Sequence, residues 1–447
     1  LKETMIMKSI LICLGALLHA PMALSAGADL KLASIFADHM VLQRDKPVAV
    51  WGWADPGESV TVRFAGQSKT TTAGTGGGWS LKLDALKASA DSRVLTGVGG
   101  AANFDAEKAA ANFPHIRYYG EASGPAEKPQ AQGKGAWTTC TPASVGRFSA
   151  TLYFFGREIH QKLGVPVGLI CSAAGATHIE SWLSAEAQSS DPDTKAEYDA
   201  QLKGWRNLDE AKLRADYPNK LAAWELAFQR GKAGMKDKPW LPETTISHIR
   251  RKGPPAGLYN GKVFNLAPFT LRGILWYQGE SNAGRPDLYQ KQLSQLVNSW
   301  RALWGDELPF AWVQLPGFTA PGGGWTSMRE ALGTVYGKKV PAVSGPLPTG
   351  SMINGGAITV SFKHAEGGLR SITGGSLTGF QVAGADHQWK PAEAKIVGET
   401  VVISNPAISQ PVAVRYAWKD FPELSLANGA GLPASPFRTD DWPALKK

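Results

Sequence analysis

Residues 148–177 read FSATLYFFGREIHQKLGVPVGLICSAAGAT and give the clearest indication of the fold class. Its large apolar residues recur at spacings of four, three and four: Phe148, Leu152, Phe155 and Ile159. This period predicts a helix over residues 145–163, and the apolar run 167–170 that follows predicts a short buried strand. A helix leading directly into a short buried strand is typical of a parallel sheet in an α/β domain.

The same alternation recurs further along the chain. The apolar run 273–277 is followed by a polar loop, a helical stretch and a second apolar run, 309–315. Short buried strands alternating with helices predict an open parallel sheet, and ligands bind such sheets beyond the carboxyl ends of the strands. The loops 171–177 and 278–282, which follow two of these strands, are therefore the candidate functional site.

On both sides of this region the period changes to two. In the first part Val60, Val62 and Phe64 alternate with polar residues, and near the other end Ile358, Val360 and Phe362 do the same. We therefore predict an N-terminal β module at 33–90, an α/β domain at 91–340 and a C-terminal β module at 341–447. Residues 185–251 keep helical spacing and predict a helical insertion, in which Pro218 marks a break or a new helix start.

Composition limits the class of protein. Of 447 residues, 43% are hydrophobic and 19% charged, which provides enough apolar residues for a core and excludes a disordered chain. Forty-seven Lys and Arg against 38 Asp and Glu give a net charge of +9. Because the basic residues are scattered, we interpret them as a solvated surface and expect no nucleic-acid partner.

The cysteines, the histidines and the N-terminus narrow the class further. Three cysteines exclude a disulfide scaffold, and eight histidines show no paired ligand spacing, so we expect neither a metal site nor a cofactor. Lys8 precedes a short apolar run, and small residues follow, so residues 1–28 are expected to be a signal peptide. We expect export to the periplasm or the cell exterior, with no membrane contact after signal removal.

An ordered series of motifs carries a family resemblance. The motifs are SIFADHMVLQR at 34–44, VWGWA at 50–54, FSA at 148–150, PVGLI at 166–170, IESW at 179–182, LYNG at 258–261, WYQGESN at 276–282 and GLPASPFR at 431–438. In this order they resemble the sialate O-acetylesterase family, exported carbohydrate esterases of the SGNH/GDSL type. The resemblance covers nearly everything from about Leu32 to Trp442.

The resemblance implies an SGNH-hydrolase-like parallel-sheet domain flanked by N- and C-terminal β-sandwich-like modules. It also implies serine-dependent hydrolysis of acetyl esters on sugars without a cofactor, so the expected partner is an acetylated carbohydrate. Gly175, Gln278, Glu280 and Asn282 are expected to stabilise an oxyanion or position the substrate, and Trp276 to stack on the sugar.

Two blocks of the family pattern are missing from this sequence. The family nucleophile lies in a Gly-Gln-Ser-Asn-Met block ahead of a Pro-x-Ile-Arg segment; residues 114–117 match that segment, but 91–112 contain no such block. The family Asp-x-x-His block belongs between Arg-Glu-Ala and Tyr-Gly-Lys, but here Ala331 is followed after four residues by Tyr336. We therefore predict an incomplete α/β domain and assign no catalytic residue.

The remaining candidates are interpreted as structural. Ser172 and Ser281 hold family-matched positions but are not the family nucleophile, and Cys171 is expected to be an inert thiol. The loop 172–177 keeps Gly175 but lacks the aromatic residue and the second glycine usual in the family. Two hypotheses follow: a catalytically impaired carbohydrate O-acetylesterase, or a non-catalytic carbohydrate-binding pseudoenzyme or deletion product.

Overall fold

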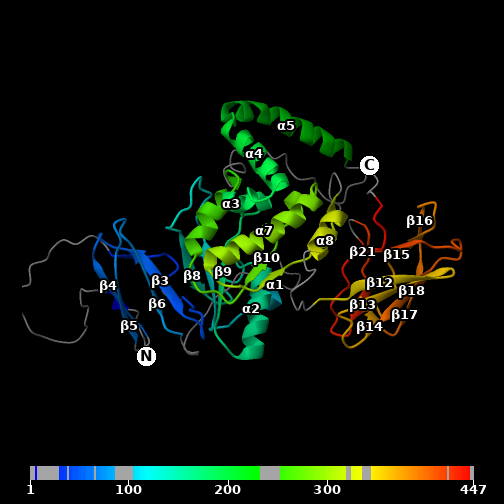
Figure 1. Ribbon diagram of the computed structural model, residues 1–447, viewed down its shortest axis with the longest axis horizontal. Helices are drawn as coiled ribbons and strands as arrows, with labels where there is room; N and C mark the ends of the chain where they lie inside the picture. The colour runs from blue at the N-terminus through cyan, green and yellow to red at the C-terminus, as the bar shows by residue number, and fades with distance from the viewer. Residues whose placement is uncertain are drawn as a thin grey trace, which may run out of the picture. The chain divides into compact units, whose positions relative to one another are not determined.

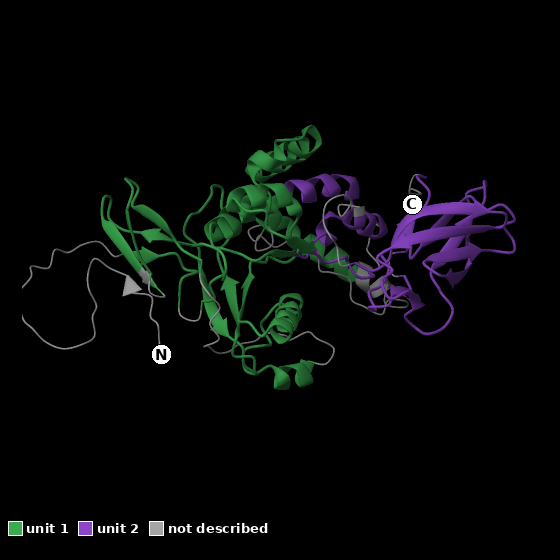
Figure 2. Ribbon diagram, turned by 60° about the horizontal axis from the view of Figure 1, so that its bottom comes forward, with its two compact units in different colours: residues 1–275, 296–311 green, residues 276–295, 312–447 purple. Residues whose placement is uncertain are grey.

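The structure, a computed structural model, describes residues 6–7, 30–37, 40–64, 67–85, 104–231, 252–318, 324–334, 344–419 and 422–442 (Figure 1). The chain divides into two compact units, residues 1–275 with 296–311 and residues 276–295 with 312–447 (Figure 2). Apart from Ile6–Met7, the predicted signal peptide lies outside the described residues. None of the described helices combines the length and the apolar character that crossing a membrane requires.

Two three-stranded sheets open the first unit. One has the order β2–β3–β6, with bounds Lys31–Leu32, Val48–Trp53 and Gly78–Leu83, and the other the order β1–β4–β5, with bounds Ile6–Met7, Ser59–Phe64 and Gln67–Thr72. Val60 and Val62 are buried as the period-two pattern predicts. Their core also contains Tyr119 and Trp137, so these sheets share one hydrophobic core with the segment that follows them.

The next sheet has the order β8–β7–β9 and contains a parallel pair, but the parallel partner of β9 is a strand that the apolar runs did not predict. The bounds are Gly135–Thr139 for β8, Ile116–Glu121 for β7 and Val167–Cys171 for β9. β7 pairs in parallel with β9, with Gly120 opposite Cys171, and antiparallel with β8. The carboxyl ends of β7 and β9 therefore meet at one edge of the sheet.

Helix α2 (Ala150–Leu163) packs on this sheet and confirms the helix predicted from the spacing of its apolar residues. The Ser149 side chain accepts the Leu152 N–H, and Gly164 ends the helix at a φ of 62°, which favours glycine. A Cβ on Gly156 would lie 2.7 Å from Leu169 of β9. The small residue therefore lets the helix approach the strand closely.

The predicted insertion is helical in its described part. It contains α3 (Ala185–Gln188), α4 (Pro192–Arg206) and α5 (Glu210–Gly231), while 232–251 lie outside the described residues. The predicted break at Pro218 is wrong, because α5 continues through it. A proline removes one backbone hydrogen bond, and a long exposed helix tolerates that loss. Of the segment 91–112, residues 104–110 form α1 (Phe104–Ala110) and 91–103 are not described.

Short strands and helices connect the two units along the chain. β10 (Ile274–Trp276) and β11 (Phe310–Trp312) form a two-stranded sheet. The helices are α7 (Pro286–Trp304) and α8 (Trp325–Thr334), and the single turns are Ile179–Ser181, Tyr259–Val263, Phe264–Leu266 and Glu280–Asn282. These short strands agree with the predicted alternation of strands and helices, but they form a sheet of their own and do not join β9 in the predicted parallel sheet.

The C-terminal region is all β, as the period-two pattern predicts. A four-stranded sheet has the order β12–β13–β18–β17, with bounds Leu347–Asn354, Ala357–Lys363, Thr400–Ser404 and Glu393–Val397. A second has the order β16–β15–β19–β21, with bounds Trp389–Pro391, Phe380–Ala383, Ala413–Tyr416 and Phe437–Arg438, and β14 (Leu369–Ser371) pairs with β20 (Leu426–Asn428). Side chains from these sheets form one hydrophobic core that includes Val360, Val382 and Phe437.

Candidate functional site

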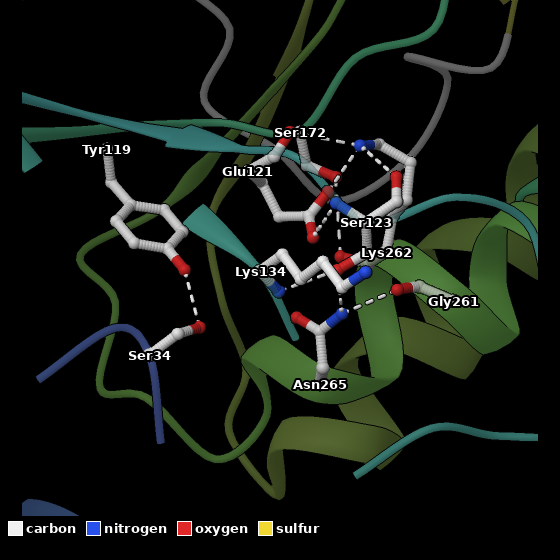
Figure 3. Close-up of polar contacts among 9 residues, drawn as sticks. All are labelled: Ser34, Tyr119, Glu121, Ser123, Lys134, Ser172, Gly261, Lys262 and Asn265. Atoms are coloured by element: carbon white, nitrogen blue, oxygen red, sulfur yellow. Dashed lines mark hydrogen bonds and ion pairs between the residues drawn. The ribbon is translucent and has the colours of Figure 1, made fainter. Parts of the chain in front are cut away.

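A buried polar cluster lies at the carboxyl ends of β7 and β9 (Figure 3). Lys262, from the turn Tyr259–Val263, forms an ion pair with the Glu121 carboxylate. Its ammonium also donates to the carbonyl oxygen of Glu121 at 3.0 Å and to that of Ser123 at 2.9 Å. The two charged side chains are 5% and 0% exposed. Because three acceptors match the three N–H donors of an ammonium, this pair is a structural cross-link.

Neighbouring polar groups extend the cluster. Asn265 donates to the carbonyl oxygen of Gly261 at 2.5 Å and to the Ser123 hydroxyl at 3.4 Å. The Ser172 hydroxyl donates to the carbonyl oxygen of Lys262 at 3.3 Å. Ser172 therefore hydrogen-bonds to the backbone, an arrangement that differs from the serine–base hydrogen bond of an activated nucleophile.

The loop after β9 presents Gly175 to solvent. Gly175 is exposed, and a Cβ built on it would meet no atom within 4 Å. Thr177 fixes the loop through two hydrogen bonds. Its hydroxyl donates to the Ala174 carbonyl at 2.8 Å and accepts the indole N–H of Trp182 at 2.9 Å. Thr177 is 3% exposed. A buried hydrogen-bonded network thus fixes a loop whose glycine remains accessible.

The second loop, residues 278–282, lies in the other compact unit. Three of the residues predicted for the site lie together in and next to it: Trp276, Gln278 and Asn282. Gln278 donates to the Asn282 side-chain oxygen at 2.8 Å. The Tyr289 hydroxyl donates to the Gln278 carbonyl at 3.0 Å and accepts the indole N–H of Trp276 at 3.1 Å. Trp276 is 7% exposed, so its ring is part of the packing around this loop. Its stacking on a sugar stays a prediction.

The backbone of this second loop depends on a glycine. Gly279 has a φ of 149°, and a Cβ there would lie 3.2 Å from Leu315. Glu280 follows at the surface, where its carboxylate reaches solvent. Burial, and then the charge of Glu280, raise the pKa of the neighbouring Tyr277 hydroxyl. Gly175 lies in the first compact unit, and Gln278, Glu280 and Asn282 lie in the second.

The thiols lack the properties of nucleophiles. Cys140 and Cys171 are not disulfide-bonded to each other. Burial raises the pKa of the Cys171 thiol and raises that of Cys140 to about 12. A raised pKa keeps a thiol protonated at neutral pH, and the thiolate is the reactive form. Among the residues that the structure describes, no group of three His, Cys, Asp or Glu side chains is placed to hold a metal ion.

Sequence reasoning missed the Lys262–Glu121 pair and the Thr177–Trp182 hydrogen bond. Lys262 and Glu121 are 141 residues apart, and no local period links them. A usable signal did exist, because Lys262, directly after Leu258-Tyr259-Asn260-Gly261, is the one charged residue in the segment 253–271. A buried lysine requires a buried acceptor.

Comparisons with known proteins support the resemblance. The family described as carbohydrate esterase, sialic acid-specific acetylesterase, matches residues 251–345. The mouse (Mus musculus) sialate O-acetylesterase is 25% identical over 363 residues, covering 68% of this chain and 63% of its own length. The human (Homo sapiens) protein of the same name is 24% identical over 328 residues, covering 62% of this chain and 54% of its own length. The chain thus spans less than two thirds of these relatives.

A solved structure gives the same indication. The crystal structure of a novel carbohydrate acetylesterase from Xanthomonas citri has a TM-score of 0.73 and 28% sequence identity to this chain. The match covers 93% of this chain and 100% of the other. Sequence and fold therefore agree: the chain is similar to the carbohydrate esterases of the sialate O-acetylesterase family.

Proposed function

We propose that the chain is a carbohydrate O-acetylesterase of the sialate O-acetylesterase type whose hydrolytic rate is impaired. The observation that carries the proposal is the second loop, where Gln278 holds the Asn282 side chain inside the segment that the family matches. An amide held at a strand end can donate to an oxyanion or to a sugar hydroxyl. On the loop after β9, we assign the same kind of role to the exposed backbone of Gly175.

The finer fold and the substrate belong to the same proposal. We assign an SGNH-hydrolase-like α/β domain flanked by β-sandwich-like modules, and an acetylated sugar as substrate. The parallel β7–β9 pair and the loops after the strands support this assignment. Export of the mature protein is also proposed, on the pattern of residues 1–28.

The impairment follows from the two missing blocks. In a comparable serine triad, removing the nucleophile or the base lowers kcat by roughly 10⁶-fold. The hydroxyl of Ser172 donates to a backbone carbonyl, so the structure offers no replacement at that position. The same observation favours a second candidate function, a carbohydrate-binding protein without catalysis.

Hydrolysis of 4-nitrophenyl acetate and of acetylated N-acetylneuraminic acid by the purified chain tests the proposal. We expect rates about 10⁶-fold below those of an intact relative, and a further loss in Asn282→Ala if residual turnover uses this amide. The variants Ser172→Ala and Ser281→Ala should leave the rate unchanged. Strong activity lost in either serine variant would identify a substitute nucleophile and overturn the impairment. Labelling with a serine-reactive phosphonate separates a different serine from a contaminant.

A further inference from the structure

An open pocket lies in the first compact unit between helix α4 and the turn Ile179–Ser181. It contains about 500 Å³ of empty space, part of which is open to solvent. Gln201 and Trp205 line one side and are four residues apart, so they share one face of α4. The opposite side is formed by the turn and by a proline-rich segment before the motif Leu258-Tyr259-Asn260-Gly261.

Hydrogen bonds fix the side of the pocket that α4 forms. The Thr194 hydroxyl, in the first turn of α4, donates to the Gln188 carbonyl at 2.8 Å. The Gln188 amide in turn donates to the Glu180 carbonyl at 3.1 Å. All three residues are buried. Helix α4 is thereby anchored to the turn that forms the opposite wall.

The proline-rich segment is fixed as well. The backbone N–H of Ala256 donates to the Glu180 carbonyl at 2.9 Å. Gly253 has a φ of 65°, and a Cβ on it would lie 2.3 Å from Pro125, so only glycine fits this place. Both walls are therefore tied to Glu180, and the pocket is formed before any ligand arrives. Binding sites for small molecules are usually preformed in this way.

The lining has the chemistry that recognises a sugar ring. The Trp205 indole and Pro255 supply an apolar wall, and Ser181 and Lys252 supply a hydroxyl and an ammonium. The Gln201 NH2 group donates to the Glu197 carboxylate at 2.6 Å, so Gln201 offers its side-chain oxygen to a ligand. None of the described lining residues is acidic. A sugar has an apolar C–H face that packs on an aromatic ring and a rim of hydroxyls that hydrogen-bond to such polar groups.

The pocket lies next to the exposed loop. His178, at its rim, is three residues beyond Gly175, which limits the separation of their Cα atoms to about 11 Å. A disaccharide spans such a distance. We propose that this pocket binds the sugar unit next to the acetylated one, so that the ligand is a glycoside of at least two sugars. The inference rests on the proposed function, because it takes Gly175 as part of the acetyl site.

Calorimetric titration of the full chain with unacetylated sugars tests the pocket without requiring hydrolysis. The probes are N-acetylneuraminic acid against 3′-sialyllactose, and xylose against xylotetraose. We expect one oligosaccharide to bind at least tenfold more tightly than its monosaccharide. Trp205→Ala and Gln201→Ala should remove this gain, whereas the control Trp224→Ala, on helix α5 of the same insertion, should keep it.

The outcomes separate the two proposals. If neither oligosaccharide binds more tightly than its monosaccharide, or if the gain survives both Trp205→Ala and Gln201→Ala in folded protein, the pocket proposal is overturned. Circular dichroism establishes whether each variant is folded. If Trp205→Ala is not folded, Gln201→Ala alone tests the pocket. The acetyl-ester assay tests the proposed function independently, because unacetylated probes report on the pocket alone.

Discussion

At the residue scale, a single ammonium group joins segments that are far apart in the sequence. Lys262 binds the end of β7 through Glu121 and the following loop through Ser123, and its own carbonyl accepts the Ser172 hydroxyl after β9. Both charges of the ion pair are almost completely removed from water. Removing one member of such a pair leaves an uncompensated buried charge, which is more costly than losing the attraction itself.

Replacing Lys262 therefore has a predictable effect. We expect Lys262→Met to lower the free energy of unfolding by about 3–5 kcal/mol, and the double variant with Glu121→Gln to recover part of the loss. The matched control is Lys195→Met in the exposed Lys195–Asp199 pair of α4, which should cost at most about 0.5 kcal/mol. Urea denaturation measures all three values. Equal losses in Lys262→Met and in the control would contradict the cross-link.

The Cys140 thiol gives a prediction for alkaline pH. Burial raises its pKa from an ordinary 9.0 to about 12, so the unfolded chain loses this proton at lower pH than the folded chain does. The protonated Cys140 thiol therefore contributes fully to the free energy of unfolding below pH 9, and this contribution is lost as the pH rises toward 12. The slope from this group is about 1.4 kcal/mol per pH unit.

Urea denaturation at pH 8, 9 and 10 measures this slope. The free energy of unfolding should fall less steeply above pH 9 in Cys140→Ala than in the unaltered chain, because the variant lacks the titrating thiol. Groups that do not interact with Cys140 titrate in both proteins and cancel in the comparison. Tyr153 does not cancel, because the charge of Cys140 contributes to the raised pKa of the Tyr153 hydroxyl. Identical slopes would show that Cys140 ionises equally easily in the folded and the unfolded chain.

At the element scale, helix α5 contains a proline in its interior, where proline is unfavourable. Pro218 lies inside Glu210–Gly231, where a proline is about 3 kcal/mol less favourable than alanine. Pro218→Ala should therefore slow amide hydrogen exchange in the central turns of α5. Pro192→Ala is the control, because Pro192 opens α4 at a position that favours proline, and exchange there should not slow. Unchanged exchange in α5 would mean that the helix already opens elsewhere.

The elements also show which part of the fold the sequence predicts. Strands of strict period two, such as β4, and the helix α2 follow from local spacing. The strand β7 was missed, because Ile116–Glu121 carries Arg117 and Glu121 at buried positions and so shows no apolar run. Both charges are buried through partners elsewhere in the fold, Glu121 with Lys262 and Arg117 with the carbonyl of Met40. A local sequence pattern does not show that a buried charge is paired with a residue far away in the sequence.

At the scale of the whole molecule, the missing blocks should affect stability as well as catalysis. Of the three apolar strand residues expected to lose neighbours, Ile170 and Leu275 are half-buried, whereas Leu169 is buried and only 3% exposed. A fully buried aliphatic side chain contributes roughly 1.5–3 kcal/mol, against a total stability of about 5–15 kcal/mol. The loss of several such contacts therefore removes a large part of the free energy of unfolding.

We accordingly expect a broad thermal transition and strong binding of a dye that reports exposed apolar surface. Inserting the Gly-Gln-Ser-Asn-Met and Asp-x-x-His blocks of a relative at their family positions should sharpen the transition and reduce dye fluorescence. Insertions of the same length with scrambled sequence are the control. A sharp, cooperative transition of the unaltered chain with little dye binding would contradict the predicted loosening.

The division of the chain into two units has a consequence for biosynthesis. The segment 276–295 belongs to the second unit, yet it emerges from the ribosome before 296–311, which belong to the first. Within its own unit, Gly279 packs against Leu315 and Met328, which are made later. At a synthesis rate of about 5–20 residues per second, several seconds pass between the synthesis of the loop with Gln278 and Asn282 and that of Leu315 and Met328. The loop therefore reaches its native packing only after these later residues have left the ribosome.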